Sequence, residues 1–264
     1  MTKPCELSLL IPVLNYEETL AQTVRGLRDA LQAHDVEIWI VFDITKPEVK
    51  DKVEEQRVVL TDLFGVRSVV RHDVRGFGSA LRYAATQATG RTLVPIMADL
   101  SDDVAVIPDM LAKVEEGADI VAGARYVKGG QTVGNTMKQR VSRFYSWLMK
   151  VLSEVRCGDV SNSFKMYRRE VWEAVQPTSD SFDLSVELAV RGAALGYELD
   201  FVAATWTNRQ AGSSNFNTLA ELRGYGRWLV YAMVHMPSKL LIVLGLGTPL
   251  LVRRLFRSSI AVAV

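Results

Sequence analysis

Three carboxylates follow an apolar run in the middle of the chain. Residues 93–103 read LVPIMADLSDD, so Asp99, Asp102 and Asp103 stand within five positions. Ser101 or one of the last two acids could cap a following helix, but that task needs only one residue. Three acids so close together repel one another unless a cation or hydrogen-bond donors intervene. The pattern favours metal or ligand binding at Asp99 and leaves both interpretations open for the other two acids.

The acidic cluster follows a segment that reads as a buried strand, and so does Asp43. Apolar runs predict strands at Leu7–Val13, Glu37–Phe42, Val66–Val70, Leu93–Ala98 and Ile120–Ala124. Helical patterns lie between these runs, the first over residues 17–33 with its leucines and Val24 on one face. This alternation predicts an α/β fold with a mostly parallel sheet that helices flank on both faces.

The carboxyl ends of the strands form the expected binding edge. Ligands of parallel sheets bind there, where loop amides and helix N-termini converge. Asp43 follows the second expected strand and Asp99 follows the fourth, so both lie at this edge, although Asp43 could instead begin a turn. Pro95 cannot donate to a sheet ladder, so we expect the fourth strand to begin near Ile96 or to carry an irregularity.

Composition narrows the class of protein. The chain has 264 residues, 48% of them hydrophobic, enough for one large domain or two small ones. Its 31 basic and 30 acidic residues nearly cancel, so no global field recruits nucleic acid and no such partner is expected. Cys5 and Cys157 show no metal-ligand spacing and suit a reducing compartment. The N-terminus does not read as a signal peptide, so the expected location is the cytoplasm.

The C-terminal part of the sequence is apolar and then basic. Residues 228–252 are apolar apart from His235 and Lys239, and three arginines follow by residue 257. The longest uncharged run, residues 240–252, has 13 residues, whereas a spanning helix needs about 20. Two interpretations of the tail, residues 231–264, stay open: peripheral contact with the cytoplasmic face of a membrane, or a hydrophobic helix docked on the domain.

The second half of the chain differs in character from the first. Glycine and polar loops occupy residues 128–135 and 207–217, and an amphipathic helix is expected near residues 138–154. Its apolar stripe comprises Val141, Phe144, Tyr145, Leu148, Val151, Leu152 and Val155. Since such stripes face a protein core more often than a membrane, we predict that this stripe faces the core of a smaller region built onto the sheet.

Seven segments, taken in order, resemble family 2 glycosyltransferases. They are LSLLIPVLNYEETL (7–20), VFDI (41–44), RGFGSALRYAATQATG (75–90), ADLSDD (98–103), GARYVKGG (123–130), NSFKMYRREV (162–171) and WTNRQAGSSN (206–215). They are most similar to the polyprenyl-phosphate sugar transferases. The resemblance implies a GT-A fold over residues 1–230, with a nucleotide-sugar half to about residue 125 and an acceptor half after it.

The resemblance also implies a reaction, in which an inverting enzyme moves a sugar from a nucleotide diphosphate to a polyprenyl phosphate or related glycan acceptor. The implied donor is of GDP-mannose or UDP-glucose type, and Mg²⁺ or Mn²⁺ would stabilise its departing diphosphate. Because a phosphate monoester is already largely dianionic at neutral pH, the acceptor needs positioning by guanidinium groups more than a base. The implied residues are Asp99, Ser101 and Asp102 for the metal, Pro12, Asn15, Asp43, Gly76 and Asp99 for the donor, and Asp99, Arg125 and Arg209 for catalysis.

The sequence departs from the family pattern at the metal site. Met97 stands where the family has its first metal-site aspartate, and Ser101 replaces a frequent glutamine. A non-catalytic protein that binds a nucleotide sugar or a partner enzyme therefore remains an alternative. Glu187 matches a recurrent family glutamate and either acts directly or holds a neighbouring loop.

A nicotinamide oxidoreductase is a further alternative. GFGSAL follows an expected strand, and Asp99 stands 21 positions beyond Gly78. However, Leu81 occupies the third glycine position, and two strand–helix units precede a fingerprint that usually opens its domain. The oxidoreductase reading is therefore the weaker alternative.

Overall fold

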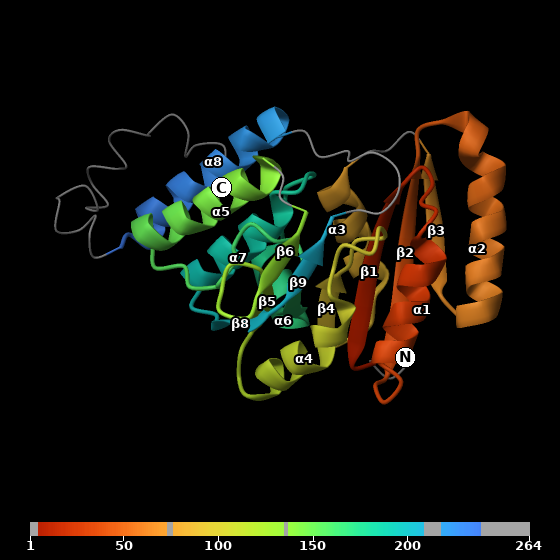
Figure 1. The fold of residues 1–264 in the computed structure, drawn as a ribbon, viewed down its shortest axis with the longest axis horizontal. Helices are drawn as coiled ribbons and strands as arrows, with labels where there is room; N and C mark the ends of the chain where they lie inside the picture. Colours follow the sequence, from red (N-terminus) through yellow and green to blue (C-terminus); the bar gives the residue numbers. More distant parts are fainter. Residues whose placement is uncertain (1–4, 73–75, 135–136, 209–217, 239–264) are drawn as a thin grey trace.

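A seven-stranded sheet runs through the protein (Figure 1). The computed structural model describes residues 5–72, 76–134, 137–208 and 218–238. The strands of this sheet are β1 (Leu7–Leu14), β2 (Val36–Ile44), β3 (Arg67–His72), β4 (Thr92–Pro95), β5 (Ile120–Ala124), β7 (Lys165–Arg168) and β8 (Leu199–Ala203). They lie in the order β3-β2-β1-β4-β7-β5-β8, and all neighbours are parallel except those of β7. The predicted α/β fold with a mostly parallel sheet is confirmed.

Helices cover both faces of the sheet. They are α1 (Leu20–Ala30), α2 (Lys50–Phe64), α3 (Phe77–Gln87), α4 (Ile107–Glu115), α5 (Met137–Leu152), α6 (Arg169–Val175), α7 (Leu184–Ala194) and α8 (Thr218–His235), with short 3₁₀ turns at Pro47–Val49 and Val104–Val106. Because side chains alternate along a strand, Leu9 packs with α1, α2 and α4 on one face, while Leu10 packs with α3, α6 and α7 on the other. Both layers are fully buried, which explains why these strands are continuously apolar.

Strand β4 differs from its expected bounds. It runs from Thr92 to Pro95, so the proline ends the strand and the expected start near Ile96 is wrong. The amide of Ile96 still donates to the carbonyl of Leu10, at 2.9 Å, so the connection to β1 continues past the proline. Pro95 therefore sits where its missing N–H does least harm to the ladder.

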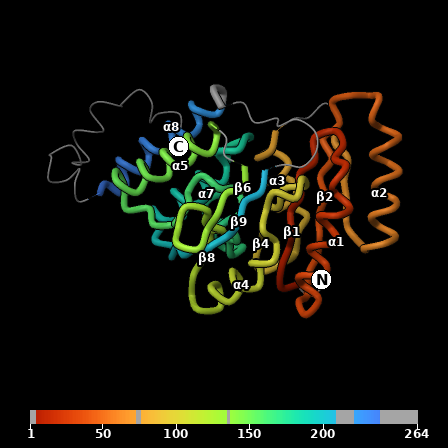
Figure 2. The backbone as a smooth tube through the Cα atoms, in the orientation of Figure 1, coloured from red at the N-terminus to blue at the C-terminus, as the bar shows by residue number. Residues whose placement is uncertain are grey.

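The two halves of the sequence share this one sheet. β7 lies antiparallel between β4 and β5, and β8 is parallel to β5 at the edge. A small second sheet pairs β6 (Gln131–Val133) with β9 (Thr205–Thr207). Helices α5 and α8 lie side by side at one end of the long axis, with α2 at the opposite end (Figures 1 and 2). The Tyr145 and Tyr225 rings meet edge to face between α5 and α8, with centroids 5.1 Å apart.

Helix α5 turns part of its apolar stripe outward. Its exposed apolar side chains are Met137, Val141, Phe144 and Trp147. Polar residues lie on the inner face, where the Ser142 and Ser146 hydroxyls form hydrogen bonds with Ser161. The core-facing stripe predicted from the sequence is therefore wrong for Val141 and Phe144, although Tyr145 packs against the core next to α8.

The beginning of the apolar C-terminal region belongs to the folded domain. Trp228, Ala232 and Val234 on α8 are buried, and the first two pack with α5 and α7 residues such as Met149 and Val186. Over the described part of the chain, none of the helices combines the length and apolarity that a membrane crossing requires. Residues 239–264, which hold the rest of the tail, lie outside the described residues.

Candidate functional site

The loops after β1 and β2 are tied together by Asn15. This residue has a left-handed backbone, with φ of 63°, and its amide donates to the carbonyl of Asp43 at 2.8 Å. Its side-chain Oδ1 accepts hydrogen bonds from the amides of Thr45 and Lys46, at 2.9 and 3.0 Å. Pro12, on β1, lies opposite Val41 on β2. The structure thus places the expected donor-side residues Pro12, Asn15 and Asp43 on neighbouring strands and loops.

Asp43 is buried and paired with an arginine that the sequence did not single out. Its carboxylate accepts two hydrogen bonds from Arg71, which stands opposite it in the β2–β3 register. Burial raises the pKa of Asp43 above its ordinary value, while the hydrogen bonds and charge of Arg71 lower it. Arg71 also donates to the carbonyl and hydroxyl oxygens of Ser79 at 3.2 Å, so it joins β2 to the first turn of α3.

The acidic loop after β4 uses its carboxylates to hold its own shape. Oδ1 of Asp99 accepts from the amide of Ser101 at 3.2 Å across the left-handed Leu100, whose φ is 61°. Oδ2 of Asp102 accepts from the amide of Met97 at 2.8 Å, and Oδ2 of Asp103 accepts from the amide of Thr205, on β9, at 3.0 Å. The cluster is therefore more than a set of helix caps, because each acid fixes a different backbone segment.

Asp99 and Asp102 remain suited to a cation. Oδ1 of Asp102 is enclosed and accepts no hydrogen bond within the described part of the chain. Burial, followed by the charge of Asp99, raises the pKa of Asp102 to about 7, although the Met97 amide opposes this. Oxygen ligands of this kind suit Mg²⁺ or Mn²⁺, and a positive charge would relieve the repulsion.

The acidic cluster does not form a complete metal cage by itself. In residues 5–72, 76–134, 137–208 and 218–238, no three His, Cys, Asp or Glu side chains are grouped to hold a metal ion. The predicted ligand Ser101 is 2% exposed, and its backbone links Asp99 to Thr207, on β9. A cation here would need further oxygen ligands from a bound molecule, such as a diphosphate.

The glycines before α3 serve close packing against another loop. The amides of Gly78 and Ser79 both donate to the carbonyl of Asp180, at 2.9 and 3.3 Å. A Cβ atom on Gly76 would lie 2.6 Å from the same oxygen, and one on Gly78 would overlap the carbonyl of Ser179. The first free amides of α3 therefore face protein and do not form an open phosphate cradle. This arrangement speaks against the dinucleotide fingerprint, and it gives Gly76 a packing role that the sequence did not reveal.

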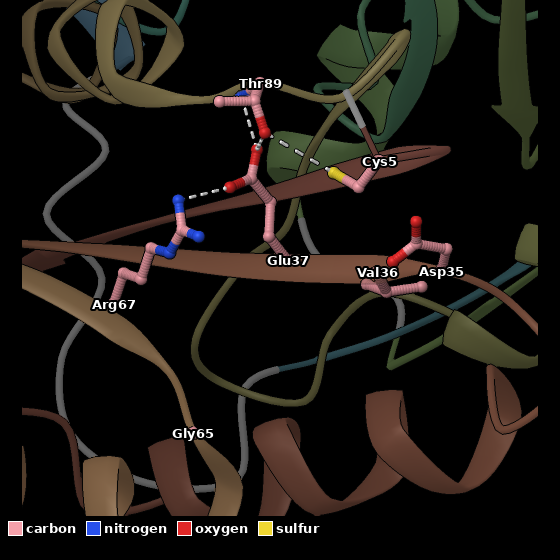
Figure 3. A pocket seen from close by; sticks show the side chains of 7 residues that line it. All are labelled: Cys5, Asp35, Val36, Glu37, Gly65, Arg67 and Thr89. Carbon is pink, nitrogen blue, oxygen red and sulfur yellow. Dashed lines mark hydrogen bonds and ion pairs between the residues drawn. The ribbon is translucent and has the colours of Figure 1, made fainter. Parts of the chain in front are cut away.

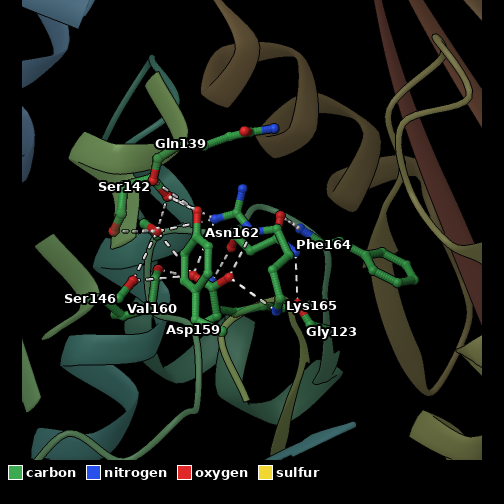
Figure 4. A network of polar contacts seen from close by, with 12 residues as sticks. Gly123, Gln139, Ser142, Ser146, Asp159, Val160, Asn162, Phe164 and Lys165 are labelled. Carbon is green, nitrogen blue, oxygen red and sulfur yellow. Dashed lines mark hydrogen bonds and ion pairs between the residues drawn. The ribbon is translucent and has the colours of Figure 1, made fainter. Parts of the chain in front are cut away.

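Arg125 lies in a buried polar network at the carboxyl end of β5. Figure 4 shows this network around Ser142, Asp159 and Lys165. The Nε of Arg125 donates to Oδ2 of Asp159 at 2.7 Å and its Nη2 to Oδ1 at 3.2 Å. Nη2 also donates to the hydroxyls of Ser142, on α5, and Ser161. Burial opposes the charge on Arg125, but Asp159 outweighs it and holds the pKa above the ordinary value. Nη1 forms no hydrogen bond with the residues that the structure describes.

The network contains further residues that the sequence did not single out. Asp159 is fully buried, and Arg125 holds its pKa below the ordinary value against the opposing effect of burial. Lys165 is also fully buried and donates to the carbonyls of Val160 and Asn162, while burial lowers its pKa. One signal was available, since Asp159 and Lys165 are the only charged residues between residues 157 and 167.

The sequence also predicts Glu187 and Arg209 as candidate site residues. Glu187 is fully buried and accepts hydrogen bonds from the amides of Thr178 and Ser179, so it holds the neighbouring loop. Arg209, expected to act beside Arg125, lies outside the described residues.

A pocket at the opposite edge of the sheet does not belong to this site (Figure 3). Cys5, Asp35, Val36, Glu37, Gly65, Arg67 and Thr89 line it. Glu37 accepts hydrogen bonds from Ser8 at 2.6 Å, Arg67 at 2.9 Å and the Thr89 hydroxyl at 3.1 Å. Burial acts to raise the pKa of Glu37, but the hydrogen bonds from Ser8, Thr89 and Trp39 outweigh it and hold that pKa below its ordinary value. Glu37 therefore fastens strands and loops at the amino ends of β1 and β2.

Solved structures share the fold. A mycobacterial protein superposes with a TM-score of 0.58 and 17% identity, over 88% of this chain and 75% of its own. Glucosyl-3-phosphoglycerate synthase from Mycobacterium tuberculosis, in complex with Mn²⁺, UDP and phosphoglyceric acid, superposes with a TM-score of 0.57 and 15% sequence identity. The superposition covers 89% of this chain and 80% of the synthase. At these identities the likeness supports the GT-A fold alone.

Proteins of similar sequence, together with a family model, show the family to which the chain belongs. The dolichol-phosphate mannosyltransferase of Pyrococcus furiosus is 26% identical over 190 residues, which are 71% of this chain and 53% of that protein. The bactoprenol glucosyl transferase of Shigella phage SfX is 28% identical over 219 residues, 80% of this chain and 67% of its own. This chain therefore spans about half of the first relative and two thirds of the second. The model of glycosyl transferase family 2 matches residues 8–175, well over half of the sequence, and the chain belongs to that family.

Proposed function

We propose that the protein is an inverting glycosyltransferase that moves a hexose from a nucleotide diphosphate to a polyprenyl phosphate. The observation that carries this proposal is the convergence of three groups at one sheet edge. Thr19, in the loop after β1, donates to the carbonyl of Ala98 at 3.0 Å, directly before Asp99. Arg125 is near enough for its charge to lower the pKa of Asp102. These contacts support a single site that combines the donor loop, the acidic loop and the buried arginine.

The donor would lie between the loops after β1 and β2 and the acidic loop. The Asn15 bridge orders the backbone there, and the pair of Asp43 with Arg71 offers polar atoms for a base or ribose. GDP-mannose and UDP-glucose are the leading donors, because one relative is named as a mannosyltransferase and the other as a glucosyl transferase.

Asp99 and Asp102 would hold the divalent cation, with the diphosphate completing its ligands. When bound, the cation would neutralise charge that develops on the departing diphosphate. The synthase from Mycobacterium tuberculosis was crystallised with Mn²⁺ or Mg²⁺ together with UDP, which supports this choice of metal. The hydrogen bonds of Asp102 to Met97 and of Asp103 to Thr205 would keep the loop in position.

The acceptor phosphate would approach Arg125. Its Nε and Nη2 are fixed by Asp159, so the guanidinium keeps one orientation, and Nη1 is available for a phosphate oxygen. No general base is needed, since the dianionic phosphate can attack the anomeric carbon without losing a proton. The names of both relatives refer to polyprenyl carriers, which supports this acceptor. Because such a carrier is a lipid, the proposal includes peripheral contact with the cytoplasmic face of a membrane.

A radiolabelled donor screen tests the proposal. The full chain is incubated with UDP-[¹⁴C]glucose or GDP-[¹⁴C]mannose, undecaprenyl phosphate and Mg²⁺ or Mn²⁺, and label is counted in the organic phase. We expect transfer from one donor, loss of transfer with EDTA, and loss in Asp99→Asn. The matched control Asp62→Asn changes an exposed acid of α2 and should transfer normally.

The alternative of a non-catalytic protein makes a different prediction. Calorimetry would then show binding of a nucleotide sugar, but no label would enter the organic phase with any donor or metal. Unchanged transfer in Asp99→Asn would remove Asp99 from the mechanism.

A further inference from the structure

The side chain of Asp103 reaches out of its own loop. Asp99 and Asp102 each accept a hydrogen bond from an amide of the acidic loop itself. In contrast, Oδ2 of Asp103 accepts from the amide of Thr205, which lies 102 positions further along the chain, at 3.0 Å. Asp103 directly precedes the 3₁₀ turn Val104–Val106, but its side chain forms no capping hydrogen bond there. This carboxylate therefore serves a long-range contact and not a local cap.

The partner of Asp103 lies on the free edge of β9. One edge of β9 pairs with β6, and alternate amides of a strand point to the same edge. On the other edge, the amide of Thr207 donates to the carbonyl of Ser101 at 3.1 Å, and the amide of Thr205 donates to Asp103. The acidic loop thus acts as a third strand beside β9, in which the Asp103 carboxylate takes the place of a backbone carbonyl.

The sheet of β6 and β9 is fixed to the carboxyl end of β5. The amide of Ala204 donates to the carbonyl of Ala124 at 3.0 Å. These two residues directly precede Thr205 and Arg125. A Cβ atom on Gly130, just before β6, would overlap the carbonyl oxygens of Ala124 and Arg125, so the ribbon packs tightly on the same backbone. A short route of hydrogen bonds therefore connects Asp103 with the backbone that carries Arg125.

The central sheet does not set the same spacing. Its ladder between β4 and β7 consists of two residue pairs, at Thr92 and Leu93, in the first half of β4. After the strand, the amide of Ile96 donates to Leu10 of β1, so this end of β4 is held on the side away from β5. Strand β9 lies between β5 and the acidic loop (Figure 1). It therefore bridges two segments that the sheet leaves apart at this edge.

We propose that Asp103 is a positioning residue that sets the spacing between the cation-binding acids and Arg125. In this role its carboxylate binds the Thr205 amide and not the cation. The inference rests on the proposed function, in which the donor diphosphate and the acceptor phosphate lie on the two sides of that spacing. A displacement of about 1 Å between reacting groups can lower a rate about 100-fold, so one hydrogen bond here has a large effect.

Hydrogen exchange tests the contact without any reaction. The ¹⁵N-labelled full chain, Asp103→Ala, Asp103→Asn and the control Asp109→Ala are compared by NMR; Asp109 is an exposed acid of α4. We expect the Thr205 amide to exchange about tenfold faster or more in Asp103→Ala. Asparagine keeps a side-chain oxygen that can accept the same bond, so Asp103→Asn should resemble the parent. The amide of Ile40, in the core of β2, reports global unfolding and should not change.

The cation separates positioning from metal ligation. Mg²⁺ is added together with UDP or GDP, and binding is followed through the amide resonances of Asp99 and Asp102. If Asp103 stays on β9, exchange at Thr205 remains slow when the metal binds. Faster exchange at Thr205 on binding would show that the carboxylate moves from β9 to the metal, and it would overturn the proposal. Fast exchange in the parent without metal would overturn it as well.

Steady-state kinetics then measure the effect on transfer. Asp103→Ala should lower kcat by about tenfold or more and leave the KM values for donor, acceptor and Mg²⁺ within about twofold, because the positions of the bound groups change and their binding does not. Asp103→Asn and Asp109→Ala should keep the kcat of the parent. A raised KM for Mg²⁺ with unchanged kcat would contradict the proposal, and so would full activity of Asp103→Ala despite fast exchange at Thr205. A parent chain without transfer would count against the proposed function, whereas the exchange results judge the Asp103 contact by themselves.

Discussion

The Asp43 carboxylate and the Arg71 guanidinium face each other across β2 and β3, with Nε–Oδ1 and Nη2–Oδ2 distances of 2.6 and 2.7 Å. The pair is almost enclosed, with 4% of the Asp43 side chain and 13% of the Arg71 side chain exposed. Two parallel hydrogen bonds of this kind fix the plane of the carboxylate. The acid that we propose to contact the donor is thus held in one orientation by a neighbouring strand.

Arg71→Met should destabilise the fold in a pH-dependent way. The variant leaves a buried carboxylate without its partner, which costs about 3 kcal/mol of unfolding free energy when the acid is charged. Arg71 lowers the pKa of Asp43, so its removal raises further a folded-state pKa that burial already raises. Below about pH 3 the acid is protonated in the folded and the unfolded state, so the charge-dependent deficit is absent. The deficit grows as the pH rises above the folded-state pKa of the parent and is complete above the higher folded-state pKa of the variant. Urea unfolding at several pH values measures it, and a deficit that shrinks with rising pH would contradict this account.

Asp159→Asn should be among the more destabilising single changes. It leaves the buried Arg125 charge without its partner, and breaking a buried pair in this way costs about 3–5 kcal/mol. Chemical unfolding of the variant and the parent gives this difference. Glu54→Gln, which removes an exposed ion pair with Arg57, should cost at most about 0.5 kcal/mol. Similar losses in the two variants would show that the network contributes little.

Gly78→Ala and Gly26→Ala should have opposite effects on stability. A methyl group at 78 would overlap the carbonyl of Ser179, so α3 and its neighbouring loop must separate, at about 1–3 kcal/mol. Gly26 lies within α1, and a methyl group there would meet only Val104, at 3.8 Å. Because alanine loses less backbone freedom than glycine when a helix forms, Gly26→Ala should stabilise the fold by about 0.5–1 kcal/mol. Thermal unfolding of both variants checks the signs. A neutral Gly78→Ala would mean that the close approach is not required.

Cys157 should resist alkylation in the folded protein. Burial raises the pKa of its thiol to about 11, so only about one molecule in a thousand carries the thiolate at pH 8. Mass spectrometry after iodoacetamide treatment, in a Cys5→Ser background, should find residue 157 unmodified until urea is added. Rapid modification under native conditions would show that this part of the core opens readily.

The sequence predicted those parts of the fold that depend on short-range pattern. The apolar runs located β1, β2, β3 and β5 to within a few residues, and the carboxyl-end rule placed Asp43 and Asp99 at the same edge. β7 was not predicted as a strand, because its four residues, KMYR, show neither alternation nor a continuous apolar run. Its antiparallel place between β4 and β5 is a long-range choice that local pattern does not encode.

The site was harder to predict where the partners lie far apart in the chain. Arg125 and Asp159 are separated by 34 positions, and Asp43 and Arg71 by 28, so no spacing rule connects either pair. The prediction of which face of α5 turns toward the core was wrong for another reason. Periodicity reveals that a helix has two faces, but the neighbouring polar network, assembled from several segments, decides which face turns inward.

The position of β7 also sets an order of events on the ribosome. A nascent chain that has emerged only as far as Ala124 has β4 and β5 without the strand that joins them, so each exposes an unpaired backbone edge. Closure must wait for residues 165–168, after α5 with its exposed Phe144 and Trp147 has left the exit tunnel. A holdase chaperone would therefore find the most exposed apolar surface on the nascent chain while residues 125–164 are being synthesised, between the completion of β5 and the arrival of β7.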